Sequence, residues 1–363
     1  MDVITREDVK RSRKQFPFYF WDDRDWNAIP INAQPKIDEV IDKSFNHPVD
    51  IETVVPAESG AITKTFLKIL QWNVFSEAHM VQTRTKAILT EIRLANADVI
   101  CLQEIRALHL AIILEDQFVR DNYCVSMNMD GFTKIIGVDK RCLMLVKKSW
   151  AAAGYLWRYS LTSQSRRSLW TFSLGGIYGA GLAIFTAQLD VGQDGEHSRK
   201  IQVRQIEEIR SEFHMKHAVI FAGDCSDDSE HSQFLYLRYN VDVWKSLNYE
   251  EPIESGWTRS PTNIMHTKYM SYYGFTSPTY TYTGNGRFDQ CWLLIGSREV
   301  LKPLSAKIIG NEAIPFPENL EDEERVEQFG NILFPSDHFG LVTEFIMAPE
   351  LQRLCPYFIG GTK

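Results

Sequence analysis

The order of apolar and polar positions predicts an α/β protein from residue 66 onward. Short apolar runs that suit buried strands alternate with segments in which apolar residues recur every three or four positions, the period of an amphipathic helix. The expected strands are 66–75, 97–105, 142–148, 169–174, 181–190, 218–225, 287–295 and 338–346. The expected helices are 80–96, 106–122 and 196–217. The stretch 245–285 is rich in Ser, Thr, Tyr and Gly and predicts a long loop, which in a compact domain is usually functional or loosely ordered.

Residues 1–62 differ from the rest of the chain. They combine aromatic and acidic residues, as in FPFYFWDDRDW, with several interrupting prolines. Disordered tails are usually poor in aromatics, so we expect 1–62 to be an N-terminal extension whose aromatic side chains pack onto a main domain at 63–348. Residues 349–363 then form a C-terminal tail. A docking segment for a partner is the alternative for the extension.

Charge and cysteine usage narrow the class of protein. The chain has 363 residues, a net charge of −8 and six scattered cysteines without a C-x-x-C pair. An acidic balance offers no overall basic surface for duplex DNA, although a local groove can still be basic. The cysteine pattern indicates neither a zinc site nor a redox motif. The charged N-terminus and the absence of a long apolar run predict an intracellular protein, cytoplasmic or nuclear, with no membrane partner.

Several of the expected strands end abruptly in polar side chains. Carboxylates gathered at one sheet edge repel one another, and burying them unpaired is costly, but a divalent cation resolves the repulsion. Magnesium takes oxygen ligands and often uses one or two carboxylates together with water and substrate phosphate. Each strand end alone is more commonly a turn, a cap or a strand-start charge. Their joint presence is specific: Asn73, Glu104, Asp224, Asp289, Asp337 and His338.

The order of these residues resembles the endonuclease/exonuclease/phosphatase family. That family shows W-N, Q-E, a T/S-H-L strand end, G-D-x-N, R-x-D and S-D-H in this order. This chain has QWN at 71–73, LQE at 102–104, TAQL at 186–189, GDCS at 223–226, RFD at 287–289 and SDH at 336–338. The resemblance spans 66–346, and the 5′-tyrosyl-DNA phosphodiesterase branch looks most similar. It implies a two-sheet α/β sandwich with helices on the outer faces and the site at one sheet edge.

The resemblance also implies a metal site. Glu104 would bind Mg²⁺ or Mn²⁺, with Asn73 hydrogen-bonding nearby and Asp337 beside the metal. Hydrolysis would follow in-line attack of water on a phosphate ester, with the metal stabilising charge on the phosphate oxygens.

The remaining matching residues would carry the chemistry. Asp224 would orient or deprotonate the attacking water, and Asp289 would hold the ring of His338 so that it contacts the phosphate. Gln188 and Ser226 stand where the family has His and Asn, and they would contact the phosphate with weaker donors.

Three departures from the family pattern leave the activity open. Besides Gln188 and Ser226, Asp228 replaces an arginine that contacts phosphate in the tyrosyl-DNA branch, and an anion there opposes a polyanionic substrate. The leading hypothesis is a phosphodiesterase acting on 5′-phosphotyrosyl or other single-stranded DNA ends, with impaired activity. The alternatives are a catalytically degenerate binding module and a phosphatase of a small or lipid phosphate. Substrate choice is expected in 245–285 and 317–330, where aromatics stack on bases or, more commonly, pack under the loop.

Overall fold

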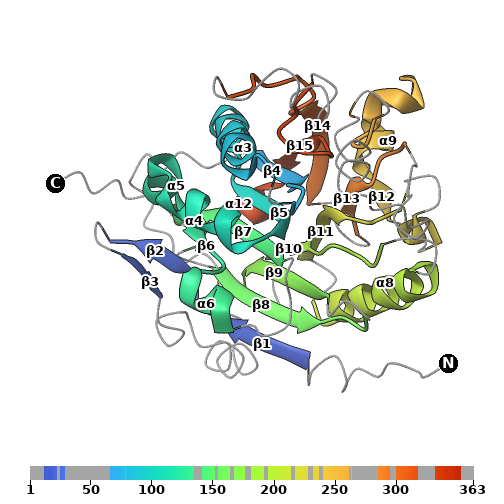
Figure 1. Cartoon of the computed structure of the whole chain (residues 1–363). Coiled ribbons are helices and arrows are strands. Elements are labelled where there is room, and N and C mark those ends of the chain that lie inside the picture. The colour runs from blue at the N-terminus through green and yellow to red at the C-terminus, as the bar shows by residue number, and fades with distance from the viewer. Residues whose placement is uncertain are drawn as a thin grey trace.

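The computed structural model describes residues 12–22, 25–28, 66–77, 79–134, 141–151, 154–163, 167–175, 181–191, 195–213, 217–227, 232–236, 240–260, 263, 285–294, 300–317 and 332–352. These residues form two mixed sheets that pack face to face, with helices on the outer sides (Figure 1). The predicted two-sheet α/β sandwich is confirmed.

One sheet has seven strands and the other has eight. The seven-stranded sheet runs in the order β1 (Arg13–Phe16), β8 (Gly154–Ser160), β9 (Ser168–Leu174), β10 (Gly181–Thr186), β11 (His217–Asp224), β13 (Asp289–Leu293) and β12 (Val241–Asp242). The eight-stranded sheet runs β14 (Leu301–Ile309), β15 (Gly340–Met347), β4 (Phe66–Asn73), β5 (Val99–Ile105), β7 (Arg141–Lys147), β6 (Tyr123–Val125), β2 (Tyr19–Trp21) and β3 (Trp26–Ala28).

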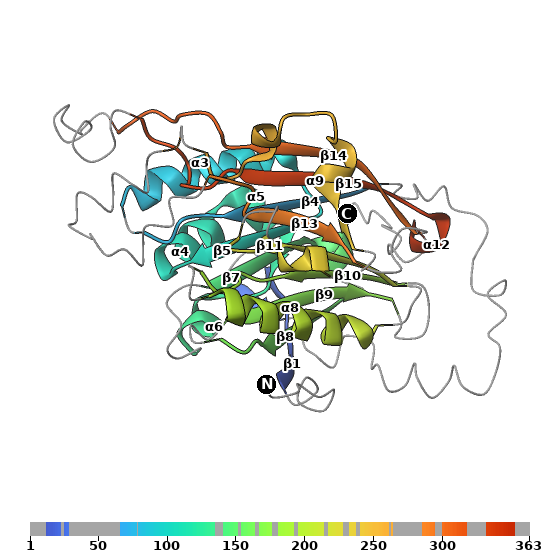
Figure 2. The ribbon, with the colours of Figure 1, turned by 90° about the vertical axis from the view of Figure 1, so that its right-hand side faces the viewer.

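The helices are short apart from two. They are α3 (Val81–Ala95), α4 (Ala107–Glu115), α5 (Gln117–Asn122), α6 (Met129–Lys134), α7 (Lys148–Ala151), α8 (Glu196–Ser211), α9 (Val243–Leu247) and α12 (Pro349–Gln352), with 3₁₀ turns η3 (Gln233–Tyr236) and η4 (Ile253–Gly256). Figure 2 shows α3 and α8 on opposite outer sides of the two sheets. No described helix is long and apolar enough to cross a membrane.

The core lies between the sheets because the central strands are buried on both faces. Every residue of β11 and β13 is buried, which explains the apolar run at the centre of β11. The outer face of the seven-stranded sheet is covered by α8, whose Val203, Ile206 and Ile209 pack into a second apolar cluster with Phe185 and Phe221. The polar side chains at the ends of these strands are themselves buried, with Asp224 2% and Asp289 0% exposed.

The described part of the N-terminal extension contributes strands to both sheets. β1 pairs with β8 in one sheet, and β2 pairs with β6 in the other. Between them Phe18 is fully buried, and the indole nitrogen of Trp26 donates to the main-chain oxygen of Leu114 at 3.0 Å. The aromatic residues of the extension thus pack onto the domain. The boundaries at 62 and 349 stay predictions.

The structure corrects some element boundaries. The expected helix at 106–122 is two helices, because Asp116 ends α4 and caps α5 by accepting from the Val119 amide at 3.2 Å. The expected helix at 196–217 ends at Ser211, and His217 already begins β11. Strands β8 and β14 were missed, since each mixes polar and apolar residues without strict alternation. The residues 264–284 and 318–331, where substrate choice was expected, lie outside the described residues.

Candidate active site

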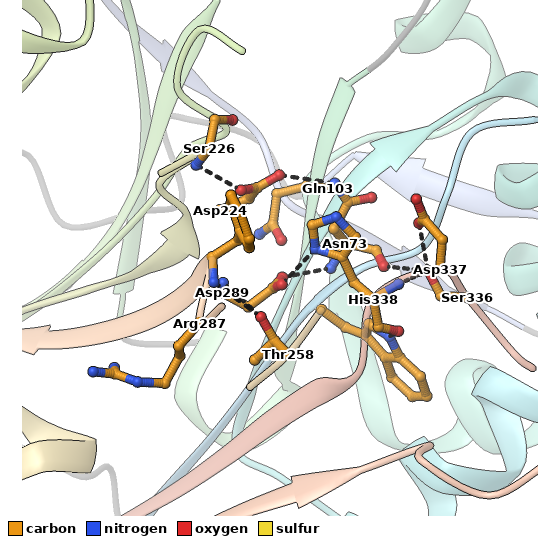
Figure 3. Close-up of polar contacts among 12 residues, drawn as sticks. Asn73, Gln103, Asp224, Ser226, Thr258, Arg287, Asp289, Ser336, Asp337 and His338 are labelled. Carbon is orange, nitrogen blue, oxygen red and sulfur yellow. Dashed lines mark hydrogen bonds and ion pairs between the residues drawn. The ribbon is translucent and has the colours of Figure 1, made fainter. Parts of the chain in front are cut away.

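Polar side chains from the ends of several strands, among them Asn73, Asp224 and Asp289, meet in one cluster (Figure 3). β4 and β5 are parallel and in register there, with Asn73 beside Gln103. β11 ends at Asp224 opposite Asp289, the first residue of antiparallel β13. The loop before β15 joins them through Ser336, whose hydroxyl donates to the main-chain oxygen of Asn73 at 2.7 Å. Both sheets therefore contribute to one polar cluster.

Trp72 explains two of the sequence motifs at once. Its indole nitrogen donates to the main-chain oxygen of His338 at 2.9 Å, which fixes the start of β15 against β4. The ring lies so close to β15 that a Cβ at Gly340 would stand 2.8 Å from it. Glycine at 340 is therefore required for the main chain at His338 to lie beside the indole. The sequences around Trp72 and around His338 and Gly340 thus meet in one contact.

The carboxylate of Asp224 is held by three hydrogen-bond donors of the protein. Its Oδ2 accepts from Asn73 Nδ2 at 2.8 Å and from Gln188 Nε2 at 3.1 Å, and its Oδ1 accepts from the Ser226 amide at 2.7 Å. Burial nevertheless raises the pKa of Asp224 above its ordinary value. A buried carboxylate with a raised pKa is a stronger base than a solvated one, as proton abstraction requires.

His338 and Asp289 form the hydrogen-bonded pair predicted from the sequence. His338 Nδ1 lies 2.6 Å from Asp289 Oδ2, although 49 positions separate the residues. The other carboxylate oxygen of Asp289 accepts from Gln71 Nε2 at 2.7 Å and from the Asn73 amide at 3.1 Å. Burial opposes the charged imidazole, but the charges of Asp289 and Asp337 outweigh it and raise the pKa of His338 to about 10. His338 is therefore an imidazolium at neutral pH.

Glu104 stands on an irregularity of β5 that aims its side chain. The pairing of β5 with β7 shifts register between Leu102 and Ile105, and Glu104 has a left-handed φ of 62°. Such a conformation is uncommon for a residue with a side chain and concentrates at functional sites. The Glu104 carboxylate accepts from the Ser76 amide at 3.1 Å and from Gln188 Nε2 at 2.7 Å. A bulge at this position turns the carboxylate into the cluster.

The donor set at Glu104 fits a sparsely coordinated magnesium ion. No group of three His, Cys, Asp or Glu side chains among the described residues could enclose a metal. Magnesium needs only one or two carboxylates when water and phosphate complete its shell. Asn73 supports Asp224 with its amide nitrogen and accepts from the Phe75 amide at 3.0 Å with its amide oxygen. Asp337 is buried, its Oδ1 lies 3.5 Å from the Ser336 hydroxyl oxygen, and its charge acts on His338.

Arg167 is a site residue that the sequence analysis missed. It donates through Nη1 to the side-chain oxygen of Gln188, whose nitrogen then faces both Glu104 and Asp224. Because arginine can only donate, this contact fixes which end of the Gln188 amide points at the carboxylates. The available signal was a basic pair immediately before an apolar strand, Arg166 and Arg167.

Ser226 does not point its hydroxyl at the cluster. Its Oγ donates to the main-chain oxygen of Leu189 at 2.8 Å, while its main-chain nitrogen holds Asp224. Its φ of 50° lies in the left-handed region, where asparagine is favoured over serine. In this arrangement the hydroxyl proton of Ser226 is engaged by Leu189, and the expected contact with phosphate stays a prediction. Asp228 lies outside the described residues, as do the loop aromatics Tyr269, Tyr272, Tyr273 and Tyr280, while Trp257 is half-buried.

Two histidines beside the cluster make the fold sensitive to acid. Burial lowers the pKa of His79 to about 4 and that of His109 to about 3, with the charge of Arg84 adding to both shifts. The unfolded chain binds these protons near pH 6.5, so their contribution to stability is complete above pH 6.5 and is lost as pH falls toward 4 and 3.

We expect His109→Gln to reduce the loss of stability between pH 6.5 and pH 4. The His109 ring accepts from the Arg106 amide at the start of α4, and glutamine at this third helical position serves the same capping role without titrating. Urea unfolding at several pH values measures the slope, with the exposed His197→Gln as the matched control. An unchanged slope in His109→Gln would show that another group causes the acid sensitivity.

Comparison with known proteins identifies what this arrangement resembles. Residues 70–293, more than half of the chain, match the model of the Endonuclease/Exonuclease/phosphatase family. A humanized D. rerio TDP2 with 14 mutations is 18% identical, with a TM-score of 0.56, and D. rerio TDP2 complexed with a single-strand DNA product is 19% identical, with a TM-score of 0.55. Each comparison covers 78% of this chain and 99% of the other. At this identity the likeness shows the fold. No curated protein sequence matches the chain.

Proposed function

This chain belongs to the endonuclease/exonuclease/phosphatase family, and on that premise we propose that it is a metal-dependent phosphodiesterase. One observation carries the proposal. A cationic His338, held by Asp289 at 2.6 Å, shares a buried cluster with Asp224, whose pKa is raised. The cluster thus combines a cation suited to phosphate with a carboxylate suited to accept a proton.

The mechanism assigns a separate task to each residue. Asp224 accepts a proton from the water that attacks phosphorus, while Asn73 and the Ser226 amide hold its carboxylate in place. Asp289 occupies Nδ1 of His338, so Nε2–H is the donor for a phosphate oxygen on which charge develops. The P–O bond opposite the water then breaks, its electron pair leaves on the departing oxygen, and that oxygen takes a proton from solvent. Asp289 itself acts only through the orientation and charge of His338.

Glu104 is the residue that would hold Mg²⁺ or Mn²⁺. A bound divalent ion would supply positive charge to the phosphate and would offset the repulsion between Glu104 and Asp224. The amide nitrogen of Gln188 lies against both carboxylates and tempers this repulsion. The amide of Gln188 also favours the second candidate function, a binding module with little turnover. A neutral amide donates a weaker hydrogen bond to phosphate than the imidazolium of a histidine at this position would.

The substrate that we propose is a single-stranded DNA end carrying a 5′-phosphotyrosyl group. Support comes from the sequence resemblance of the GD, RFD and FPSDHFGL segments to the tyrosyl-DNA branch. A structural neighbour, D. rerio TDP2, was solved with a single-strand DNA product.

A substrate panel tests the function. At neutral pH with Mg²⁺, we expect slow hydrolysis of 5′-phosphotyrosyl single-stranded DNA, and less of an abasic duplex, an aryl phosphodiester or an inositol polyphosphate. Asp224→Asn defines the background. Gln188→His with Ser226→Asn should raise the rate, because each restored donor is worth about 10²-fold or more when it acts at the transition state.

Two results would contradict the proposal. Hydrolysis of the inositol polyphosphate and of no other substrate would indicate the alternative function, a phosphatase of a small phosphate. Equal rates for wild type and Asp224→Asn on all substrates, unchanged by the double substitution, would leave the binding module. Calorimetry of Mg²⁺ and of a phosphotyrosyl DNA oligonucleotide would then show whether such a module retains its ligands.

A further inference from the structure

Arg84 occupies an unfavourable position for a cation. It lies in the first turn of α3 and its side chain is fully buried. Burial of a charge is costly, and the N-terminal end of a helix is the positive end of its dipole. No acidic residue lies in this first turn. An arginine placed here therefore needs strong compensating contacts.

Main-chain oxygens supply that compensation, and they come from two separate loops. In the loop between β4 and α3, the Arg84 guanidinium donates to Val74 at 3.1 Å, to Phe75 at 3.2 Å from both terminal nitrogens, and to Glu77 at 2.5 Å. In the loop before β15, it donates to Pro335 at 3.5 Å. One rigid planar group thus joins a loop next to Arg84 in the sequence to a loop in which Pro335 lies 251 positions from Arg84.

These two loops contact different residues of the candidate site. The first begins at Asn73 and presents the Ser76 amide to Glu104 at 3.1 Å. The second presents Ser336 and His338, and Ser336 reaches across to the main-chain oxygen of Asn73 (Figure 3). A shift of either loop would change the distance between the carboxylate of Glu104 and the imidazolium of His338.

The first loop also holds strain that something must maintain. Phe75 and Met80 have left-handed φ values of 57° and 48°. Such residues cost about 1–3 kcal/mol each and persist only when their surroundings over-determine them. The Arg84 guanidinium holds Phe75 in this conformation. It donates twice to the Phe75 main-chain oxygen, and its central carbon lies 5.0 Å from the centre of the Phe75 ring.

We propose that Arg84 is a positioning residue that locks the 74–77 loop to the 335–338 loop and so sets the spacing of Glu104 and His338. The catalytic part of this inference rests on the proposed function. Lysine keeps the charge of Arg84 but has one nitrogen, which cannot reach both loops with the geometry of the planar fork. Arg84→Lys should therefore release the lock while retaining a cation.

Three measurements test the lock. In Arg84→Lys, amide hydrogen exchange should accelerate about tenfold or more in both loops and stay unchanged in β11 and β13. The affinity for Mg²⁺, measured by calorimetry without substrate, should fall about tenfold. Turnover of the phosphotyrosyl DNA should lose about 10² in kcat with KM nearly unchanged, because misplacement by about 1 Å has this effect on rate.

The matched control is Arg120→Lys. Arg120 also donates to a main-chain oxygen, that of Leu114 at 2.8 Å, and stacks on an aromatic ring, Trp21 at 3.8 Å, but it lies away from the site. If Arg84→Lys lowers the melting temperature as Arg120→Lys does and leaves loop exchange, Mg²⁺ affinity and kcat at wild-type values, Arg84 only stabilises the fold and the proposal is wrong. Acceleration in one loop alone would also overturn it.

Two further results keep the inference separable from the proposed function. Loop exchange and Mg²⁺ affinity can be measured without turnover. If both change in Arg84→Lys although the wild type hydrolyses no substrate, the lock is supported and the proposed phosphodiesterase activity is rejected. Should Arg84→Lys fail to fold, Phe75→Leu removes the ring beneath the guanidinium and should produce smaller changes of the same sign in both loops. Wild-type exchange in a folded Phe75→Leu, with no folded Arg84→Lys, would count against the lock.

Discussion

Replacing Asp289 with asparagine should lower the rate of phosphodiester hydrolysis by about 10³–10⁴-fold, the loss seen when a carboxylate that orients a catalytic histidine becomes an amide. The structure gives the reason. Asp289 accepts from the His338 ring with one oxygen and from Gln71 and the Asn73 amide with the other. An asparagine has one acceptor, so its nitrogen must face a donor on one side.

The same substitution should lower the pKa of His338. Burial opposes its charge, and the charges of Asp289 and Asp337 overcome this and raise the pKa to about 10. The raised value means that the folded protein binds the proton more tightly than the unfolded chain. This contribution to stability is complete below pH 6.5, is lost as pH rises through about 10, and should shrink in Asp289→Asn. Proton NMR of the His338 ring measures the shift.

Asp242→Asn is the matched control for these two results. Asp242 is a buried carboxylate paired with Arg287, and it caps α9 without contacting His338. We expect it to reduce stability while activity per folded molecule remains. If Asp242→Asn and Asp289→Asn lose activity in proportion to stability alone, His338 has no orienter in the reaction.

Replacing Glu104 with glutamine should weaken Mg²⁺ or Mn²⁺ binding at least tenfold. The side-chain volume is unchanged, but the charge is lost and an amide nitrogen must face either the Ser76 amide or Gln188 Nε2. Calorimetric titration measures the affinity directly. Metal should also stabilise the wild-type fold by about 2.7 kcal/mol at a hundred times its Kd, and this gain should be absent from Glu104→Gln at the same concentration.

Glu344→Gln controls for the change in net charge. Glu344 lies on β15 and pairs with Lys68 at 2.8 Å, away from the cluster. We expect its metal affinity to equal that of wild type. Equal affinities for Glu104→Gln and wild type would move the metal to another group and remove Glu104 from the site.

The class of fold is determined by the sequence alone, because many strands and helices of this chain have a clear local order of apolar and polar residues. A buried strand such as β11 carries a continuous apolar run at 218–222, and a helix such as α8 repeats its apolar residues on one face, so both are visible without a structure. Strands β8 and β14 carry polar residues on half-exposed faces, and their pairing partners alone define them. The local sequence pattern is therefore a weak predictor of a strand whose stability comes from pairing with neighbouring strands.

The sequence by itself determined which polar side chains stand at strand ends, since Asn73, Glu104, Asp224, Asp289 and His338 can be recognised from the apolar runs beside them. Tertiary structure alone decided what each of them contacts. The Ser226 hydroxyl turns to Leu189, Arg167 fixes the Gln188 amide, and Arg84 bridges two loops. The physical reason is that hydrogen bonds depend on direction as well as on residue type. Backbone conformation and residues far along the chain set that direction, and a linear order of residues does not encode it locally.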